Sequence, residues 1–206
     1  MTRARLRLPQ LAAAALCAVA LAGCVTLLPK SKPAQLYRFG DTAAAPVAQP
    51  HRGVGVFRTN GSFVSEADGD RILTVTGGKA AYVAQSRWVA PASVLFNEAL
   101  ASAFDADPGP VRLIARGQRG KADYALRLDV RNFETRYDSG PDAAPTVLVR
   151  AYAALTRSDQ TTVGEQVFEA RVPAADNRMG AIVAAYDRAV ADVLAKLVAW
   201  TKASAR

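Results

Sequence analysis

Hydrophobic residues in the second half of the chain alternate with polar ones, and this alternation predicts strands. From Tyr124 to Val130 every second residue is large and apolar, which is typical of a strand with one buried face. The apolar phase then slips to Phe133, which indicates a β-bulge near Asn132. The same reasoning predicts two further strands, over residues 146–155 and 163–172. Short turns separate the three, so residues 124–172 are expected to form an antiparallel meander.

A different spacing predicts two helices. The first covers residues 91–104, where Pro91 is acceptable as the first helical residue. The second runs from about Arg178 to Thr201, and Arg188, Asp192 and Lys196 lie off its apolar stripe. That stripe consists of Ile182, Tyr186, Ala189, Val193, Leu197 and Trp200. A helix that packs on the core is expected, and a helix that lies on a membrane surface is the alternative.

Shorter apolar runs complete the predicted fold. Gly77-Gly78 between two β-prone runs is typical of a hairpin. The short strands are expected at residues 35–39, 54–57, 71–75, 81–84 and 111–114. The predicted fold is a single α/β (α+β) domain with a largely antiparallel or mixed sheet and the two helices on one face.

The N-terminal region has the order of a secretory signal. Three arginines at positions 3, 5 and 7 precede an apolar run that is too short to cross a bilayer, and small residues follow it. The run ends in Leu21-Ala22-Gly23-Cys24, which is a lipobox. Cleavage between Gly23 and Cys24 would make Cys24 the lipidated first residue, and the alternative is an ordinary signal sequence with an incidental cysteine. The predicted organisation is a signal sequence at 1–23, a lipidated cysteine and tether at 24–34, and a domain at 35–206.

The composition of the chain argues against several classes of function. The chain has 206 residues and a formal charge of +8. That charge falls when the signal arginines are removed, so the mature chain is only mildly basic and no nucleic-acid partner is predicted. Its two cysteines are Cys17, in the signal, and Cys24. The single histidine, His51, directly follows the expected loop at 40–50. With one histidine and no free thiol in the mature chain, neither a metal site nor another cofactor is predicted.

No constellation of residues indicates catalysis. The chain has no Gly-x-Ser-x-Gly sequence. Gly53-Val54-Gly55 lacks the other residues of a phosphate-binding loop, and Asp68-Gly69-Asp70 lacks the later ligands of a calcium loop. We therefore predict no catalytic residue and no enzyme.

The order of features resembles the ABC-type transport auxiliary lipoproteins, the PqiC-like family. The lipobox and short tether are followed by Leu36-Tyr37-Arg38-Phe39. Further along, the hairpin leads to Arg87-Trp88-Val89-Ala90-Pro91 and a helix rich in Leu and Phe. The distinctive residues are Arg87, Trp88 and Pro91. We expect Trp88 to be a packing anchor and Arg87 to pair with a carboxylate or carbonyl oxygen.

The resemblance implies a role in intermembrane lipid transport. Such lipoproteins are implied to work with an ABC ATPase, a permease and a mammalian-cell-entry domain protein that together move phospholipid or another hydrophobic molecule. Val25 rather than aspartate after Cys24 favours the outer membrane, with the domain facing the periplasm. Two alternatives stay open, namely an activator of a periplasmic cell-envelope enzyme and a periplasmic lipid chaperone.

One face of the predicted meander is a candidate partner surface. Arg127 and Arg131 are out of phase with the apolar residues of their strand, and Arg150 and Tyr152 are out of phase with those of the next strand. If the strands pair, these four side chains share the outer face with Asp129. This face is either simply solvated, or it binds the mammalian-cell-entry protein or another copy of the chain, since Arg and Tyr are favoured at interfaces.

Overall fold

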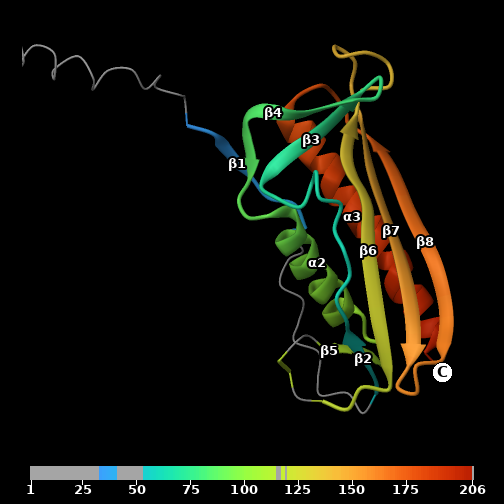
Figure 1. The fold of residues 1–206 in the computed structure, drawn as a ribbon. Helices are drawn as coiled ribbons and strands as arrows, with labels where there is room; N and C mark the ends of the chain where they lie inside the picture. The colour runs from blue at the N-terminus through green and yellow to red at the C-terminus, as the bar shows by residue number, and fades with distance from the viewer. Residues whose placement is uncertain (1–32, 41–52, 115–116, 119, 206) are drawn as a thin grey trace, which may run out of the picture. The chain divides into compact units, whose positions relative to one another are not determined.

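The computed structural model describes residues 33–40, 53–114, 117–118 and 120–205. It divides into two compact units, Met1–Pro33 and Ala34–Arg206, and every element below belongs to the second. Gly23, Cys24, His51 and nearly all of the expected loop at 40–50 lie outside the described residues. The elements follow in the order β1 (Gln35–Tyr37), β2 (Val54–Arg58), β3 (Arg71–Thr76), β4 (Lys79–Trp88), α2 (Ala92–Ala106), β5 (Val111–Ile114), β6 (Tyr124–Arg136), β7 (Thr146–Arg157), β8 (Thr162–Pro173) and α3 (Met179–Ser204) (Figure 1).

Strands β6, β7 and β8 form the predicted antiparallel meander. Each pairs with the next over nearly its whole length. The register of β6 against β7 shifts between Val130 and Asn132, which confirms the expected bulge. Strand β7 ends two residues beyond its predicted bound, at Arg157, and β8 is longer than predicted by one residue at each end.

The remaining strands make the sheet mixed. Among the described residues the sheet has eight strands, and its path is β1-β4-β3-β6-β2-β5, with β7 and β8 added on the far edge of β6. The pairs β1–β4, β3–β6, β2–β6 and β2–β5 are parallel, whereas β3–β4 is the expected antiparallel hairpin. Gly77 and Gly78 turn this hairpin with φ of 53° and 80°, a region that glycine enters without strain.

The segment between β2 and β3 was not expected to have regular structure, but it follows the edge of β6. The Val64 N–H donates to the Val130 carbonyl, and the Val130 N–H donates to the Ser62 carbonyl. A Cβ at Gly61 would lie 1.7 Å from the carbonyl oxygen of Leu128, so only glycine allows this approach. These contacts satisfy backbone groups of β6 between the places where β2 and β3 pair with it.

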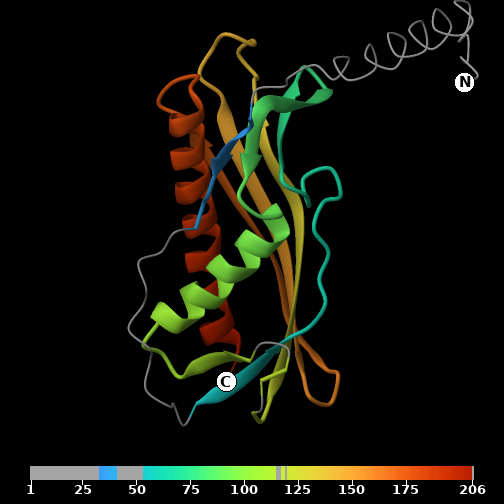
Figure 2. The same cartoon turned by 90° about the vertical axis from the view of Figure 1, so that its left-hand side faces the viewer.

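Both helices cover the same face of the sheet, as predicted (Figure 2). The ring of Phe133 on β6 lies 6.4 Å from the ring of Phe96 on α2 and 4.8 Å from that of Tyr186 on α3, measured between centroids. The expected stripe of α3 is buried apart from its last member, Trp200, which is half-buried. The predicted start of α2 is wrong by one residue, because Pro91 is its N-cap, with extended ψ of 137°. In the described part of the chain, neither helix has the length and hydrophobicity needed to cross a bilayer.

Candidate functional site

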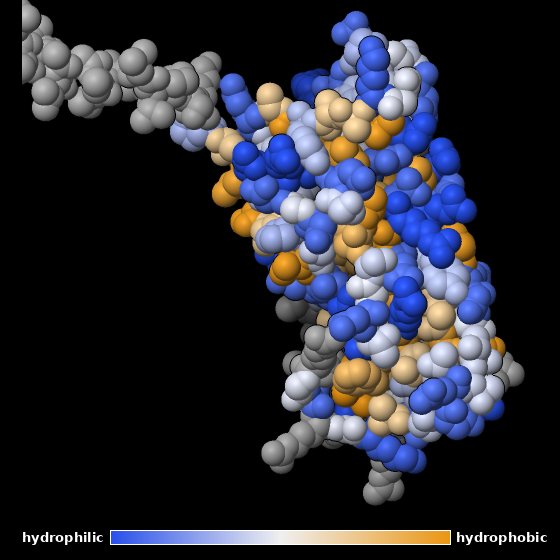
Figure 3. All heavy atoms as spheres, viewed as in Figure 1, coloured by the Kyte–Doolittle hydropathy of each residue, from blue (hydrophilic) through white to orange (hydrophobic). Residues whose placement is uncertain are grey.

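The outer face of the meander brings together the side chains that the alternation predicted. Opposite residues across an antiparallel pair point to the same side of the sheet. Asp129 lies opposite Tyr152, and Asn132 lies opposite Arg150. Arg127 is two residues from Asp129 and therefore shares its face. We call the face carrying Arg127, Arg131, Arg150 and Tyr152 the outer face, and it is predominantly hydrophilic (Figure 3).

Asp129 is the most buried charged group on this face, with its side chain 9% exposed. Its carboxylate accepts hydrogen bonds from the Ser62 N–H at 2.8 Å and the Ser62 hydroxyl at 3.0 Å. Arg127 completes the set with an Nε–Oδ2 distance of 3.1 Å. Burial alone would raise the pKa of Asp129, but the Ser62 hydrogen bonds and Arg127 outweigh it and hold the pKa below its ordinary value.

Arg131 and Tyr152 form a stacked pair. The guanidinium carbon of Arg131 lies 4.3 Å from the centre of the Tyr152 ring. A hydrogen bond with the Glu165 carboxylate raises the pKa of Tyr152 above its ordinary value, and burial acts in the same direction. Tyr152 therefore links an arginine of β6 to a carboxylate of β8.

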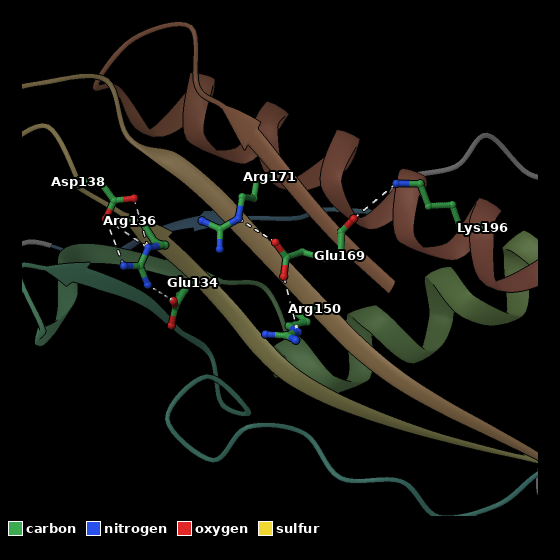
Figure 4. A network of polar contacts seen from close by, with 7 residues as sticks. All are labelled: Glu134, Arg136, Asp138, Arg150, Glu169, Arg171 and Lys196. Atoms are coloured by element: carbon green, nitrogen blue, oxygen red, sulfur yellow. Dashed lines mark hydrogen bonds and ion pairs between the residues drawn. The ribbon is translucent and has the colours of Figure 1, made fainter. Parts of the chain in front are cut away.

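Arg150 belongs to a charge network that crosses three elements (Figure 4). Glu169 on β8 accepts from Arg171 at 2.8 Å and pairs with Arg150 on β7 at 3.6 Å. Lys196 on α3 donates to the Glu169 backbone carbonyl at 3.4 Å. This last contact satisfies a carbonyl group of β8, which pairs only with β7 among the described strands.

A second cluster in Figure 4 lies on β6 and the turn after it. Arg136 donates to the Glu134 carboxylate at 2.9 Å and contacts the Asp138 carboxylate at 3.2 Å. The hydrogen bond with Asp138, followed by that with Glu134, raises the pKa of Arg136. Both clusters pair opposite charges. The arginine side chains of these clusters are therefore held in place by carboxylates, and the net charge of the outer face is small.

The Arg87-Trp88-Pro91 segment has a structural role. Trp88 is 2% exposed, which confirms its prediction as a packing anchor. Its ring lies 4.9 Å from that of Phe39 and 5.1 Å from that of Tyr186, both edge to face. Arg87 points outward and donates to the Asp70 carboxylate at 2.9 Å, as expected for a carboxylate pair.

An apolar groove lies between α2 and α3. Its volume is about 680 Å³. The lining is mostly small and aliphatic, with Asp107, Asp187 and Arg188 also contributing. This groove was not predicted from the sequence, although repeated alanines on both helices are the signal that marks it: Ala99, Ala103 and Ala106 on α2, and Ala191, Ala195 and Ala199 on α3.

The charged partners of the outer-face arginines were not predicted from the sequence either. Glu165, Glu169 and Arg171 alternate with inward-facing residues of β8, as do Glu134 and Arg136 on β6. That alternation was visible, but the strand register that pairs these groups was not. Within the described ranges, no cluster of three His, Cys, Asp or Glu side chains has the arrangement of a metal site.

Comparison with known proteins identifies a family and a fold. A family model described as the ABC-type transport auxiliary lipoprotein component matches residues 64–198. Protein XCC0632 from Xanthomonas campestris, assigned to the family model DUF330, has a TM-score of 0.71 and 25% identity, and the match covers 83% of this chain and 96% of that one. Another crystal structure, described as an uncharacterized protein, has a TM-score of 0.64 and 12% identity over 82% of this chain and 99% of that one, which shows the shared fold. No curated protein sequence matches the chain.

Proposed function

Because the chain belongs to the family of ABC-type transport auxiliary lipoprotein components, we propose that it serves an intermembrane phospholipid transport system from the outer membrane. In this proposal the signal sequence at 1–23 is removed and Cys24 carries the lipid. The tether at 24–34 holds the domain at 35–206 in the periplasm. The partner is the mammalian-cell-entry protein of a transporter that also has a permease and an ATPase, and the ATPase provides the energy.

The observation that carries the docking part of this proposal is the ordering of the outer face. Arginine side chains lose conformational entropy when they bind, and those already held by neighbours lose less. Arg127 is held by Asp129, Arg150 by Glu169, and Arg131 by the ring of Tyr152. Their side chains stay accessible, since those of Arg127 and Arg150 are 60% and 45% exposed. Exposed but ordered arginine and tyrosine side chains are favoured at protein interfaces.

The test is capture of the mammalian-cell-entry partner by the lipidated protein. A variant with Arg127, Arg131 and Arg150 replaced by serine should capture at least about tenfold less partner at moderate salt. A matched control replaces Arg112, Arg178 and Arg188 with serine, which removes the same charge from other surfaces, and it should capture normally. Undiminished capture by the first variant would exclude the outer face as the docking site. A Cys24→Ala variant tests the anchor, since it should lose fatty-acid labelling.

The groove between α2 and α3 supports a second candidate, a lipid chaperone. An apolar groove of this size can shield part of an acyl chain, and its alanines leave the space that a larger residue would fill. A fluorescent fatty acid should bind the wild-type domain, and Ala195→Phe should weaken that binding by about tenfold. Equal binding by both would remove the groove from consideration, whatever the outcome of partner capture.

A further inference from the structure

Large hydrophobic side chains are rarely exposed in the described chain, and those that are gather in one region. Leu36 is 59% exposed and Val89 is 49% exposed. Tyr82 and Val94 are also exposed, whereas Val167 on β8 is the one such residue from another part of the described fold. The first four come from β1, β4, the turn that follows β4 and the start of α2. In Figure 3 hydrophobic surface is visible along the left edge, at the level of β1 and the turn between β4 and α2.

Strand pairing places several of these residues side by side. Leu36 on β1 lies opposite Arg87 on β4, and Arg87 lies opposite Arg71 on β3. The Val89 N–H donates to the Tyr37 carbonyl, which brings Val89 next to β1. The guanidinium carbon of Arg71 lies 3.9 Å from the centre of the Tyr82 ring. We call Leu36, Arg71, Tyr82, Arg87 and Val89 the anchor-side patch.

Of the two arginines in this patch, one is paired with a carboxylate of the described chain and the other is not. Arg87 is paired with Asp70, whereas Arg71 forms no salt bridge with any described residue. Two arginines directly opposite each other across a strand pair repel, so the pair favours binding of an anionic group. Exposed aliphatic side chains beside an arginine and a tyrosine are the composition that suits the interface of a phospholipid bilayer.

The position of the patch along the chain indicates which surface it meets. Only residues 25–34 separate Cys24 from β1, and ten residues span at most about 35 Å when fully extended. The first strand of the fold, which carries Leu36, is therefore held near the bilayer by the proposed lipid anchor. The proposed tether would therefore keep a membrane permanently within reach of the patch.

We infer that the anchor-side patch rests on the bilayer that carries the lipid of Cys24. Leu36 and Val89 enter the interfacial layer, Tyr82 lies at the headgroup level, and Arg71 binds a lipid phosphate. The inference depends on the proposed anchor, but it adds a second membrane contact that fixes the orientation of the domain. Transport could fail as the proposed function while this contact persists, because the contact is measured with lipid alone.

The test uses a chain that starts at residue 25. The described core begins at Phe39 and lies within the unit Ala34–Arg206, so this chain retains the fold. Binding is measured by co-sedimentation with vesicles of phosphatidylethanolamine and phosphatidylglycerol. The double variant Leu36→Glu/Val89→Glu should bind at least about tenfold more weakly, and Arg71→Gln about fivefold more weakly. Val167→Glu and Arg112→Gln are the matched controls, and both should bind as the wild type does.

A second measurement does not depend on these substitutions. The chain from residue 25 has no cysteine, so Leu36→Cys or Val167→Cys can carry a single polarity-sensitive fluorophore. Vesicles should shift the emission to shorter wavelength for the label at position 36 and leave it unchanged at position 167. Absence of that shift, or of vesicle binding by the unsubstituted chain, would overturn the inference. Dimerisation through position 36 in the absence of lipid would overturn it too and would identify a second copy as the occupant.

Discussion

The two faces of the β6–β8 meander differ in almost every physical property. On the inner face Phe133, Val149 and Leu155 are at most 1% exposed and pack under the helices. On the outer face Arg127, Arg150 and Arg171 have side chains that are about half exposed and paired with carboxylates. One alternating pattern produces both. The comparison teaches that the inner face supplies the stability of this domain, whereas the outer face is available for recognition.

Four aromatic rings form a cluster at the inner face. Rings of Phe39, Trp88, Phe133 and Tyr186 lie at centroid distances between 4.8 and 6.4 Å. They come from the segment after β1, from β4, from β6 and from α3, so the cluster joins elements far apart in the sequence. Apolar burial of this kind is the largest favourable contribution to folding.

The largest expected effect comes from removing the centre of this cluster. Trp88→Ala should lower the free energy of unfolding by about 3–5 kcal/mol, because it leaves a large cavity that the neighbouring rings cannot fill. Trp200→Ala is the control, since Trp200 is half-buried and its ring contacts Phe168. Urea unfolding followed by circular dichroism measures both. Equal losses for the two variants would show that Trp88 contributes no more to the inner face than a half-buried aromatic residue does.

An intermediate effect is expected at Asp129, the most buried charged group of the outer face. Asp129→Ala should cost about 1–3 kcal/mol, because the Ser62 N–H and hydroxyl and the Arg127 guanidinium all lose a carboxylate that is only 9% exposed. Asp192→Ala, which removes an exposed ion pair with Lys196, should change the stability by less than about 0.5 kcal/mol. Unfolding curves of both variants and of the wild type give the comparison.

The contribution of Asp129 should also depend on pH. Its pKa in the folded state is lower than the ordinary value of 3.8, so its carboxylate stabilises the fold above that pH. The contribution is lost as pH falls through the folded-state pKa. The difference in stability between wild type and Asp129→Ala should therefore be constant near neutral pH and shrink below about pH 4. A difference that stayed constant into strong acid would show that the charge of Asp129 is irrelevant.

Much of the inner face could be predicted from the sequence because burial imposes a period. The apolar stripe of α3 and the alternation of β6 each identify the buried side of their element. A single shift in the phase of that alternation indicates the bulge near Asn132. The short strands β1, β2 and β5 were found as strands, but their parallel pairing was not expected. Three to five residues carry too little pattern to determine a neighbour.

The outer face could be predicted only as a set of residues on one side. Alternation placed Arg127, Arg131, Arg150 and Tyr152 together, and the strand pairing confirms this. It could not provide the contact of Arg150 with Glu169, because that pair depends on the register between β7 and β8. The contact of Asp129 with Ser62 was equally invisible, since it requires an irregular segment to follow the edge of β6.

The smallest expected effect on stability is the most informative about the difference between the two faces. Replacing Arg127, Arg131 and Arg150 with serine removes interactions of exposed side chains, which water and salt already screen. The free energy of unfolding should therefore change by less than about 1 kcal/mol in total, even though the same variant is expected to lose partner capture. Thermal and urea unfolding at low and moderate salt measure the first quantity, and capture measures the second. A loss of stability comparable to that of Trp88→Ala would mean that the outer face, too, maintains the fold, and reduced capture would then report unfolding rather than docking.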